Sequence, residues 1–350
     1  RAGCIVLYGE TSGISAIWGG GTVTRVLTIN SRVAKKKYDV ANLVDGAVEW
    51  TTARVGSAGK LTFTIVKHGE IMVHEGDQVR FSADGKSYFL GYVFQKEKKQ
   101  EKITITCYDM LRYLKAKQSY NFKGKKLADV VRQIAQEFYL TVGELADTGY
   151  VMPAKIYEEK TMLDIITDCI RVSTIATGKS YVLFDDVGRL SVKEIAAMRS
   201  RYQLSGDDLV TNYTYTTSIE DSYNYIKLIK PNKKSGKGDA YVEQDSSKIK
   251  AWGKLQYYEK VDEDANEAQI KEKARNLLRY YAQTGRKLNL SAIGVDDIRA
   301  GSMVLVDIPN LGDISLKKML LVNQCTHKWT SSSHTMELYA NGEFYPANCG

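Results

Sequence analysis

GDQVRFSADGKSYFLGYVF, residues 76–94, joins two apolar stretches through the dipeptide Asp84-Gly85. Tight hairpin turns require a positive φ angle, which glycine adopts at little cost, so these residues predict two antiparallel strands. The segments on either side, KLTFTIV (60–66) and ITITCY (103–108), alternate apolar and polar side chains with the period of two expected of a half-buried strand. Residues 47–108 therefore predict a small antiparallel barrel or sandwich.

Beyond this sheet the apolar period becomes that of a helix. In KKLADVVRQIAQEF, residues 125–138, apolar side chains recur at helical spacing. A second helix is expected from the N-cap Thr161 to a break at Gly178, and SYVLFDDVGRLSVKEI (180–195) then predicts two strands. Residues 114–200 are therefore interpreted as a separate α+β unit.

The closing strands repeat the early ones in outline. GDQVRF (76–81), FLGYVF (89–94) and ITITCY (103–108) have counterparts in GSMVLV (301–306), KMLLVN (318–323) and HTMELY (334–339). Each set is a glycine-led apolar strand, a second apolar strand, a polar hairpin and an alternating third strand. This recurrence predicts the duplication of one barrel.

The expected fold class is α+β and mainly β, with two similar small antiparallel β-barrels. An α/β unit is inserted between them, and a helix of about residues 263–284 interrupts the second barrel. The expected domains are an unassigned N-terminal extension, the first barrel, the α+β domain and the second barrel, at residues 1–37, 38–113, 114–200 and 201–345.

Several of these strands are apolar on both faces. A strand that faces water on its outer side should be polar at every second position. The exceptions, interpreted as subunit-interface candidates, are Tyr88, Leu90, Tyr92, Phe94, Met303 and Leu305. Because a large exposed apolar patch is normally an interaction surface, either the helical unit of the same chain or another subunit must cover them. The 23 tyrosines suit an interface, since their rings pack while their hydroxyls stay wet.

The composition is that of a folded globular protein. The chain has 350 residues and 39.2 kDa, enough for two or three domains, and its 43% of hydrophobic residues excludes a disordered or fibrous chain. A mean hydropathy of -0.31 and the absence of a long apolar run predict no transmembrane helix. The net charge of +8 is dispersed, as in KEKKQEK (96–102), which favours a solvated surface over a nucleic-acid patch.

The cysteines and the N-terminus carry little signal. Five cysteines without a CxxC pair indicate reduced thiols, at Cys4, Cys107, Cys169, Cys325 and Cys349. No signal-peptide pattern is recognisable at the N-terminus.

No catalytic, cofactor or metal motif withstands inspection. ATGKS (176–180) resembles the end of a phosphate-binding loop, but Ser173 stands where a glycine is required and the segment closes a helix. Cys325 and His327 share a strand face, with His334 across the following hairpin, so a metal site or a thiol–base pair is conceivable. A small buried cysteine in a barrel is the favoured interpretation, because no further oriented partner is suggested.

Several of these runs together carry a family resemblance. VEWTTARVGSAGKLTFTIVK (48–67), ITITCYDMLRYL (103–114), IATGKSYVLFDD (175–186) and LQYYEKVDEDANEAQIKEKARNLL (255–278) resemble the XkdQ/YqbQ-type baseplate hub proteins of contractile phage tails, defective prophages and phage-tail-like bacteriocins. The resemblance covers about residues 38–340 and leaves the first 37 residues unassigned.

The resemblance implies a ring. Hubs of this family are similar to the hub of large myophages, a homotrimer whose two barrels per chain approximate six-fold symmetry. The implied partners are the six-fold tail tube protein, the three-fold central spike protein and other baseplate proteins, with no membrane and no sequence-specific nucleic acid. No catalytic residue or cofactor is implied. Assembly in the bacterial cytoplasm and a place in the tail baseplate follow from the same likeness.

The leading hypothesis is therefore a structural adaptor between tube and spike. It expects apolar sheet surface that stays uncovered until sister copies close a circle around a pore. The rivals are a peripheral cell-wall-binding module, which would expose aromatic side chains in a shallow groove, and a Cys-dependent peptidoglycan hydrolase that uses Cys325 and His327.

Overall fold

A computed structural model describes residues 23–69, 71–206, 209–231, 238–261, 266–311, 314–341 and 344–346. The chain forms two compact units. One contains the described residues up to Tyr213 and from Asn289, and the other is residues 214–288. Strands β14 (Val210–Ser218) and β18 (Gly285–Ile293) cross the boundary between them.

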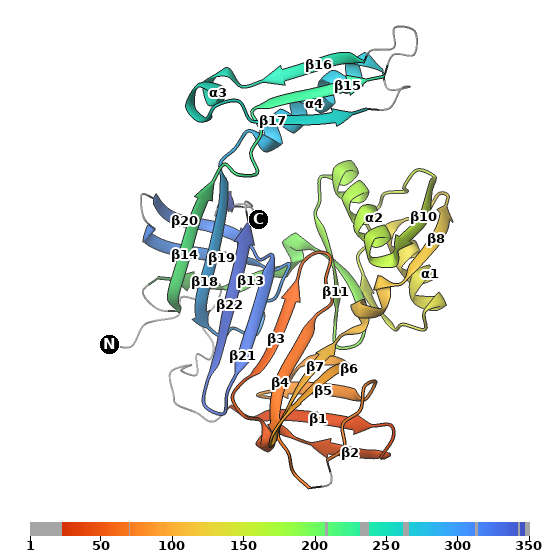
Figure 1. Cartoon of the computed structure of the whole chain (residues 1–350), viewed down its shortest axis with the longest axis vertical. Coiled ribbons are helices and arrows are strands. Elements are labelled where there is room, and N and C mark those ends of the chain that lie inside the picture. The colour runs from red at the N-terminus through yellow and green to blue at the C-terminus, as the bar shows by residue number, and fades with distance from the viewer. Residues whose placement is uncertain are drawn as a thin grey trace. The chain divides into compact units, whose positions relative to one another are not determined.

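The first unit is built on an antiparallel sheet (Figure 1). Its early strands are β1 (Arg25–Ser31), β2 (Lys36–Asp39), β3 (Val48–Ala53), β4 (Lys60–Val66), β5 (Gln78–Ala83), β6 (Lys86–Lys99) and β7 (Lys102–Tyr108), with a 3-10 turn η1 at Ala41–Leu43. Leu61, Phe63 and Ile65 of β4 are buried on one face while Thr62 and Thr64 occupy the other, as the period of two predicts. β1 and β2 lie partly in the segment that the sequence left unassigned, and β1 pairs with β5.

The Asp84-Gly85 hairpin is confirmed. The φ angles of Asp84 and Gly85 are 47° and 81°, and the flanking strands β5 and β6 pair antiparallel. Positive φ at both central residues is the geometry of the tight turn that matches strand twist.

The second strand set follows the α/β unit. It contains β13 (Arg199–Ser205), β19 (Met303–Leu311), β20 (Ile314–Leu321), β21 (Gln324–Trp329), β22 (His334–Asn341) and β23 (Phe344–Pro346), together with β14 and β18. β19 and β20 form an antiparallel pair, as do β21 and β22. The hairpin β19–β20 thus corresponds to β5–β6, and β22 to β7.

One detail separates the two repeats. In the first, the single strand β6 pairs with both β5 and β7, and its register with β7 shifts between Val93 and Gln95. In the second, the same task is divided between β20 and β21, which are separated by Val322 and Asn323. Residues left out of the pairing bend a strand. At corresponding places the first repeat therefore has a bulge within β6, and the second has an interruption between β20 and β21.

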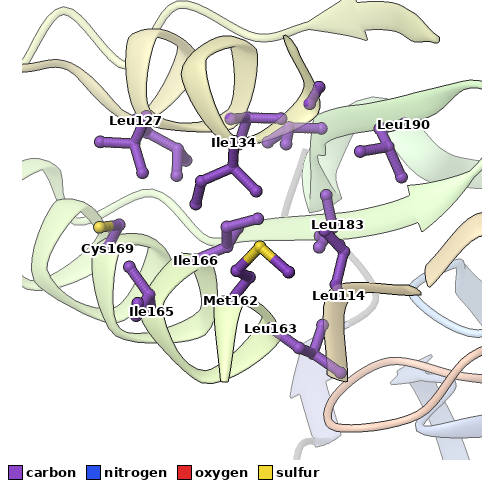
Figure 2. Packing of buried hydrophobic residues seen from close by; sticks show 14 of the residues in the cluster. Leu114, Leu127, Ile134, Met162, Leu163, Ile165, Ile166, Cys169, Leu183 and Leu190 are labelled. Atoms are coloured by element: carbon purple, nitrogen blue, oxygen red, sulfur yellow. The ribbon is translucent and has the colours of Figure 1, made fainter. Parts of the chain in front are cut away.

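An α/β unit lies between the two strand sets. It comprises η2 (Met110–Lys115), β8 (Lys117–Phe122), α1 (Leu127–Glu137), β9 (Val142–Leu145), β10 (Lys155–Thr161), α2 (Met162–Thr177), β11 (Tyr181–Asp185), β12 (Leu190–Glu194) and η3 (Ile195–Met198). Figure 2 shows α1 and α2 packing their apolar stripes together, with Ile134 and Ile166 fully buried. Leu114 of η2 and Leu183 of β11 complete this core.

The predicted second helix is confirmed with its ends. The hydroxyl of Thr161 accepts a hydrogen bond from the Asp164 amide at 3.1 Å, and Gly178 ends the helix at φ 71°. Both residues satisfy backbone groups that a helix end leaves unpaired.

The unit of residues 214–288 is a three-stranded sheet with helices. β15 (Tyr225–Lys230) lies between β16 (Asp239–Gln244), which is antiparallel to it, and β17 (Gln256–Lys260), which is parallel. α3 (Ser246–Trp252) was not expected, whereas α4 (Glu267–Tyr281) falls within the predicted segment. Asn266 caps α4 by accepting from the Gln269 amide at 3.0 Å.

The fold class is confirmed as mainly β, with large antiparallel sheets and an inserted α/β unit. Closure of each strand set into a barrel and the four domain boundaries stay predictions. Among the described residues, no helix combines the length and the apolar character that crossing a bilayer requires.

Candidate assembly interface

One continuous sheet contains the first strand set together with β14, β18, β22 and β21 of the second, while β13, β19, β20 and β23 form a sheet of their own. β21 pairs antiparallel with β3 from Val48 opposite Trp329 to Ala53 opposite Gln324. The hydroxyls of Thr51 and Thr326 are 3.0 Å apart, and the Arg54 amide donates to the Asn323 carbonyl at 2.8 Å. We call this pairing the internal junction.

The internal junction covers an aromatic cluster. Trp329 is fully buried, and its ring centroid lies 4.9 Å from Phe81 of the first set and 4.6 Å from Tyr88. The His327 ring stacks between Trp50 and Trp329, at 5.7 Å and 5.2 Å. Since the cluster draws on strands of both sets, they bury one common core.

A polar network crosses this cluster. The Tyr88 hydroxyl donates to Asp296 at 2.5 Å, and Nε2 of His327 lies 2.7 Å from the Ile298 carbonyl. A carbonyl only accepts, so Nε2 carries the hydrogen and Nδ1 of His327 accepts from Nε2 of His334 at 2.9 Å. Nδ1 of His334 is then unprotonated and 3.8 Å from Asp296.

The candidate ligands Cys325, His327 and His334 are placed close to this network. Nδ1 of His327 is already occupied as an acceptor, and burial raises the pKa of the Cys325 thiol, whose sulfur lies 3.9 Å from the Ile298 carbonyl. In the part of the chain that the structure describes, no three His, Cys, Asp or Glu side chains are grouped to hold a metal ion. The two histidines act in packing and hydrogen bonding.

Acid is expected to destabilise the protein through this histidine pair. Burial lowers the pKa of His327 to about 3 and that of His334 to about 4, from the usual 6.5. Both stay neutral in the fold while the unfolded chain binds protons below about pH 6.5, so stability is complete above that pH and falls as the pH drops towards 4 and 3.

The variant His334→Gln isolates the effect. It retains a donor towards His327, and the loss of unfolding free energy between about pH 7 and about pH 5 should shrink by about 2 kcal/mol. Urea unfolding at both pH values measures it. Burial raises the pKa of Asp185 to about 6 and stabilises the fold in acid, but this contribution is common to both proteins and cancels. An unchanged difference would show that His334 is protonated in the native state.

A second buried polar group ties the α/β unit to both strand sets. Asp109 accepts from the Gly59 amide at 2.8 Å, and the guanidinium of Arg299 donates to the Asp185 carbonyl at 3.1 Å and lies over the Phe184 ring at 4.4 Å. Sequence reasoning did not single out Arg299, and it assigned Asp296 to a turn without its contact with Tyr88. No local signal marks them, because their partners lie far away in the chain.

The chain itself covers three of the six subunit-interface candidates. Tyr88 is 5% exposed, and Met303 and Leu305 pack against Val182 and Phe184 of the α/β unit. The sequence left open whether the same chain or another subunit covers these residues. For Met303 and Leu305 the cover comes from the α/β unit of the same chain. Tyr88, Met303 and Leu305 are therefore not part of an apolar sheet surface that stays uncovered in the single chain.

The other three candidates are half-buried. Leu90 reaches the turn at Gly188, and Tyr92 packs against the α/β core. Phe94 meets the Tyr108 ring edge-on at 5.4 Å. A role in a subunit interface stays a prediction for all six residues. Phe94 is the candidate nearest to an unpaired strand edge, because the pairing of β6 with β5 ends at Tyr92.

Besides the terminal strand β2, the sheet offers two free strand edges. Its order is β14-β18-β22-β21-β3-β4-β7-β6-β5-β1-β2. β5 pairs with β6 only as far as Tyr92, so residues 95–99 have β7 as their strand neighbour in the described sheet. At the far side, β14 is the last strand. These two edges are the open edges.

The open edges are counterparts of the strands that meet at the internal junction. The order β14-β18-β22-β21 is repeated by β3-β4-β7-β6, so β14 corresponds to β3 and the end of β6 to β21. The sequence held a signal for this: KLTFTIV (60–66) of β4 resembles KLNLSAI (287–293) of β18, and WTTA (50–53) of β3 resembles YTTS (215–218) of β14. Each repeat can therefore receive another on one edge and offer itself on the other.

The outer face of this sheet is polar and rich in threonine. Thr64 and Thr104 have their hydroxyls 2.9 Å apart, as Thr51 and Thr326 do across the internal junction. Lys328 lies between Glu337 at 2.8 Å and Glu49 at 3.8 Å. A sheet face of this polar composition can face water without exposing apolar surface.

This architecture is that of phage tail proteins. A crystallised 43 kDa tail protein of prophage MuSo2 from Shewanella oneidensis superposes with a TM-score of 0.66 at 14% identity, over 90% of this chain and 97% of that one. The Escherichia coli type VI secretion component c3393, described as similar to the bacteriophage T4 tail proteins gp27 and gp5, has a TM-score of 0.51 at 9% identity, over 87% and 74%.

The chain belongs to the YqbQ-like family, whose model matches residues 48–341. It is 30% identical over 312 residues to the uncharacterised protein YqbQ of Bacillus subtilis, covering 87% of this chain and 94% of that protein. It is also 30% identical over 269 residues to XkdQ of the phage-like element PBSX, covering 76% and 81%. The family resemblance drawn from the sequence is confirmed.

Proposed function

We propose that the chain is the hub of a contractile-tail baseplate, a ring-forming adaptor that joins the tail tube to the central spike. It acts in an infectious phage or a phage-tail-like bacteriocin, as a homotrimer beside other baseplate proteins. It assembles in the bacterial cytoplasm and works without catalysis or cofactor.

The observation that carries this proposal is the head-to-tail repeat with its open edges. A strand edge presents unpaired N–H and C=O groups, and natural proteins rarely leave long edges uncovered. Pairing the end of β6 in one copy with β14 in the next repeats the internal junction, since those strands correspond to β21 and β3. Such a heterologous contact closes into a ring when the rotation fits.

Three copies give a ring in which six similar strand sets alternate between internal and external junctions. Such a ring would match the six-fold symmetry of the tube on one side and the three-fold symmetry of the spike on the other. The threonine-rich face would line the channel, and the α/β unit, which packs on Met303 and Leu305 of the separate sheet β13-β19-β20-β23, would lie outside. This arrangement replaces apolar cover by sister copies as the physical cause of the ring.

Partners in the tail are supported by relatives of the fold. The c3393 chain is described as a type VI secretion component similar to two tail proteins, and XkdQ belongs to a phage-like element. We extend that setting to this chain.

Deletion of the coding gene from a particle-producing strain tests the proposal. Particles should then lack both an attached tube and an incorporated spike, and complementation should restore both. Normal particles that carry tube and spike would refute the adaptor role.

The hydrolase rival has less support. A cysteine nucleophile needs an accessible thiolate, whereas Cys325 is fully buried and its thiol pKa is raised by that burial. The wall-binding rival would need exposed aromatic side chains on the particle's periphery. Peptidoglycan cleavage that is lost in Cys325→Ala, with normal assembly, would restore the enzyme hypothesis.

A further inference from the structure

The sheet of residues 214–288 has one covered face. Ile226 and Leu228 of β15 are fully buried against Ile270 and Ala274 of α4. Ion pairs join the same face to the helix, with Glu259 of β17 at 2.7 Å from Lys273. Arg275 of α4 is likewise 3.3 Å from Glu243 of β16.

Alternate residues of the three strands form the opposite face, which we call the open face. Because successive side chains of a strand point to opposite sides, it carries Tyr225, Lys227, Ile229, Val242, Tyr258 and Lys260. The register places Val242, Lys227 and Tyr258 side by side in one row across the sheet. Val242 is 42% exposed and Tyr258 is 52% exposed.

The charge of the open face has one sign. Lys227 and Lys260 lie on it, and Lys254 places its ammonium 3.5 Å from the centre of the Tyr225 ring. The acidic residues Glu243 and Glu259 occupy the helix-side positions, so no Asp or Glu stands at an open-face position of these strands. Positive charge without internal compensation attracts a negatively charged partner.

The open face also contains apolar side chains where a sheet normally carries cover. β15 and β17 are parallel, and parallel strands are usually covered on both faces by helices. Ile229 and Val242 beside lysines suit a helix with an apolar stripe and acidic flanks. Single-stranded nucleic acid would instead need a row of free aromatic faces, and Tyr258 has one whereas the Tyr225 ring is capped by Lys254.

We propose that the open face binds an amphipathic helix of another tail protein, with Asp and Glu residues flanking its apolar stripe. The site uses residues other than those of the strand edges proposed for the ring. The inference rests on the proposed function only for the source of this partner.

Lysine footprinting with an acetylating reagent tests it, on the free chain and on purified particles. Lys227 and Lys260 should react about tenfold more slowly in the particle, while Lys271 on the exposed side of α4 should keep its rate. Zero-length carbodiimide coupling should link the two protected lysines to carboxylates of a second tail protein.

Charge reversal supplies the second measurement. The double variant Lys227→Glu with Lys260→Glu should retain ring assembly and lose the cross-linked partner about tenfold or more, whereas Lys271→Glu should lose nothing. Equal reactivity in chain and particle overturns the inference, as does protection that nuclease or removal of wall polymers abolishes. Absence of the chain from the particles would instead contradict the proposed function.

Discussion

Asn212→Pro in β14 is expected to abolish ring assembly while leaving the single chain folded. The Ile293 amide donates to the Leu209 carbonyl at 3.0 Å, and the Thr211 hydroxyl reaches the Ser291 carbonyl at 3.1 Å. Odd-numbered residues of β14 therefore direct their backbone groups to β18, and the amide of Asn212 points to the open edge. Proline removes that donor, at an edge position where a strand tolerates it.

The loss should be large because every external junction of the ring contains β14. Removing the donor leaves an unpaired carbonyl in the partner and weakens each junction by about 3 kcal/mol, roughly a hundredfold. Light scattering or native mass spectrometry measures the mass of the assembly, and the yield of complete particles is measured beside it. Asn212→Ala keeps the amide and should assemble normally. Equal assembly of both variants would exclude β14 from the junction.

Trp329→Ala is expected to destabilise the first unit by about 3–5 kcal/mol. Trp329 is fully buried in β21, yet it packs on Phe81 of β5 and on Tyr88 of β6. The substitution leaves a cavity in the core that the two strand sets share, so the loss of unfolding free energy should reach the upper part of this range. Denaturant unfolding followed by far-ultraviolet circular dichroism measures the change.

Val33→Ala is the control for that variant. Val33 is 67% exposed, and its truncation should alter the unfolding free energy by no more than about 0.5 kcal/mol. A cost below about 1 kcal/mol for Trp329→Ala would mean that the two strand sets fold on separate cores.

Local signals in the sequence were sufficient for the elements that they marked, although they did not give β1, β2 or α3. The Asp84-Gly85 turn and the helix from Thr161 to Gly178 appear where predicted, because positive φ and capping are decided by a few adjacent residues. The repeated strand pattern indicated duplication for the same reason.

Long-range contacts were beyond the sequence. Nothing local shows that the α/β unit folds back over Met303 and Leu305, or that Trp329 of a distant strand packs on Tyr88. The pairing of β21 with β3 joins residues far apart in the chain, and the contact of Tyr88 with Asp296 depends on that pairing. The open edges of the sheet follow from the strand order, which periodicity does not give.

A density map of the assembled tail, at a resolution that traces strands, tests the ring most directly. The proposed pairing requires three copies around the axis, with β14 of each copy beside residues 95–99 of the next and the threonine face towards the channel. A map in which either open edge faces solvent, or in which the chain lies away from the tube-to-spike connection, would contradict it.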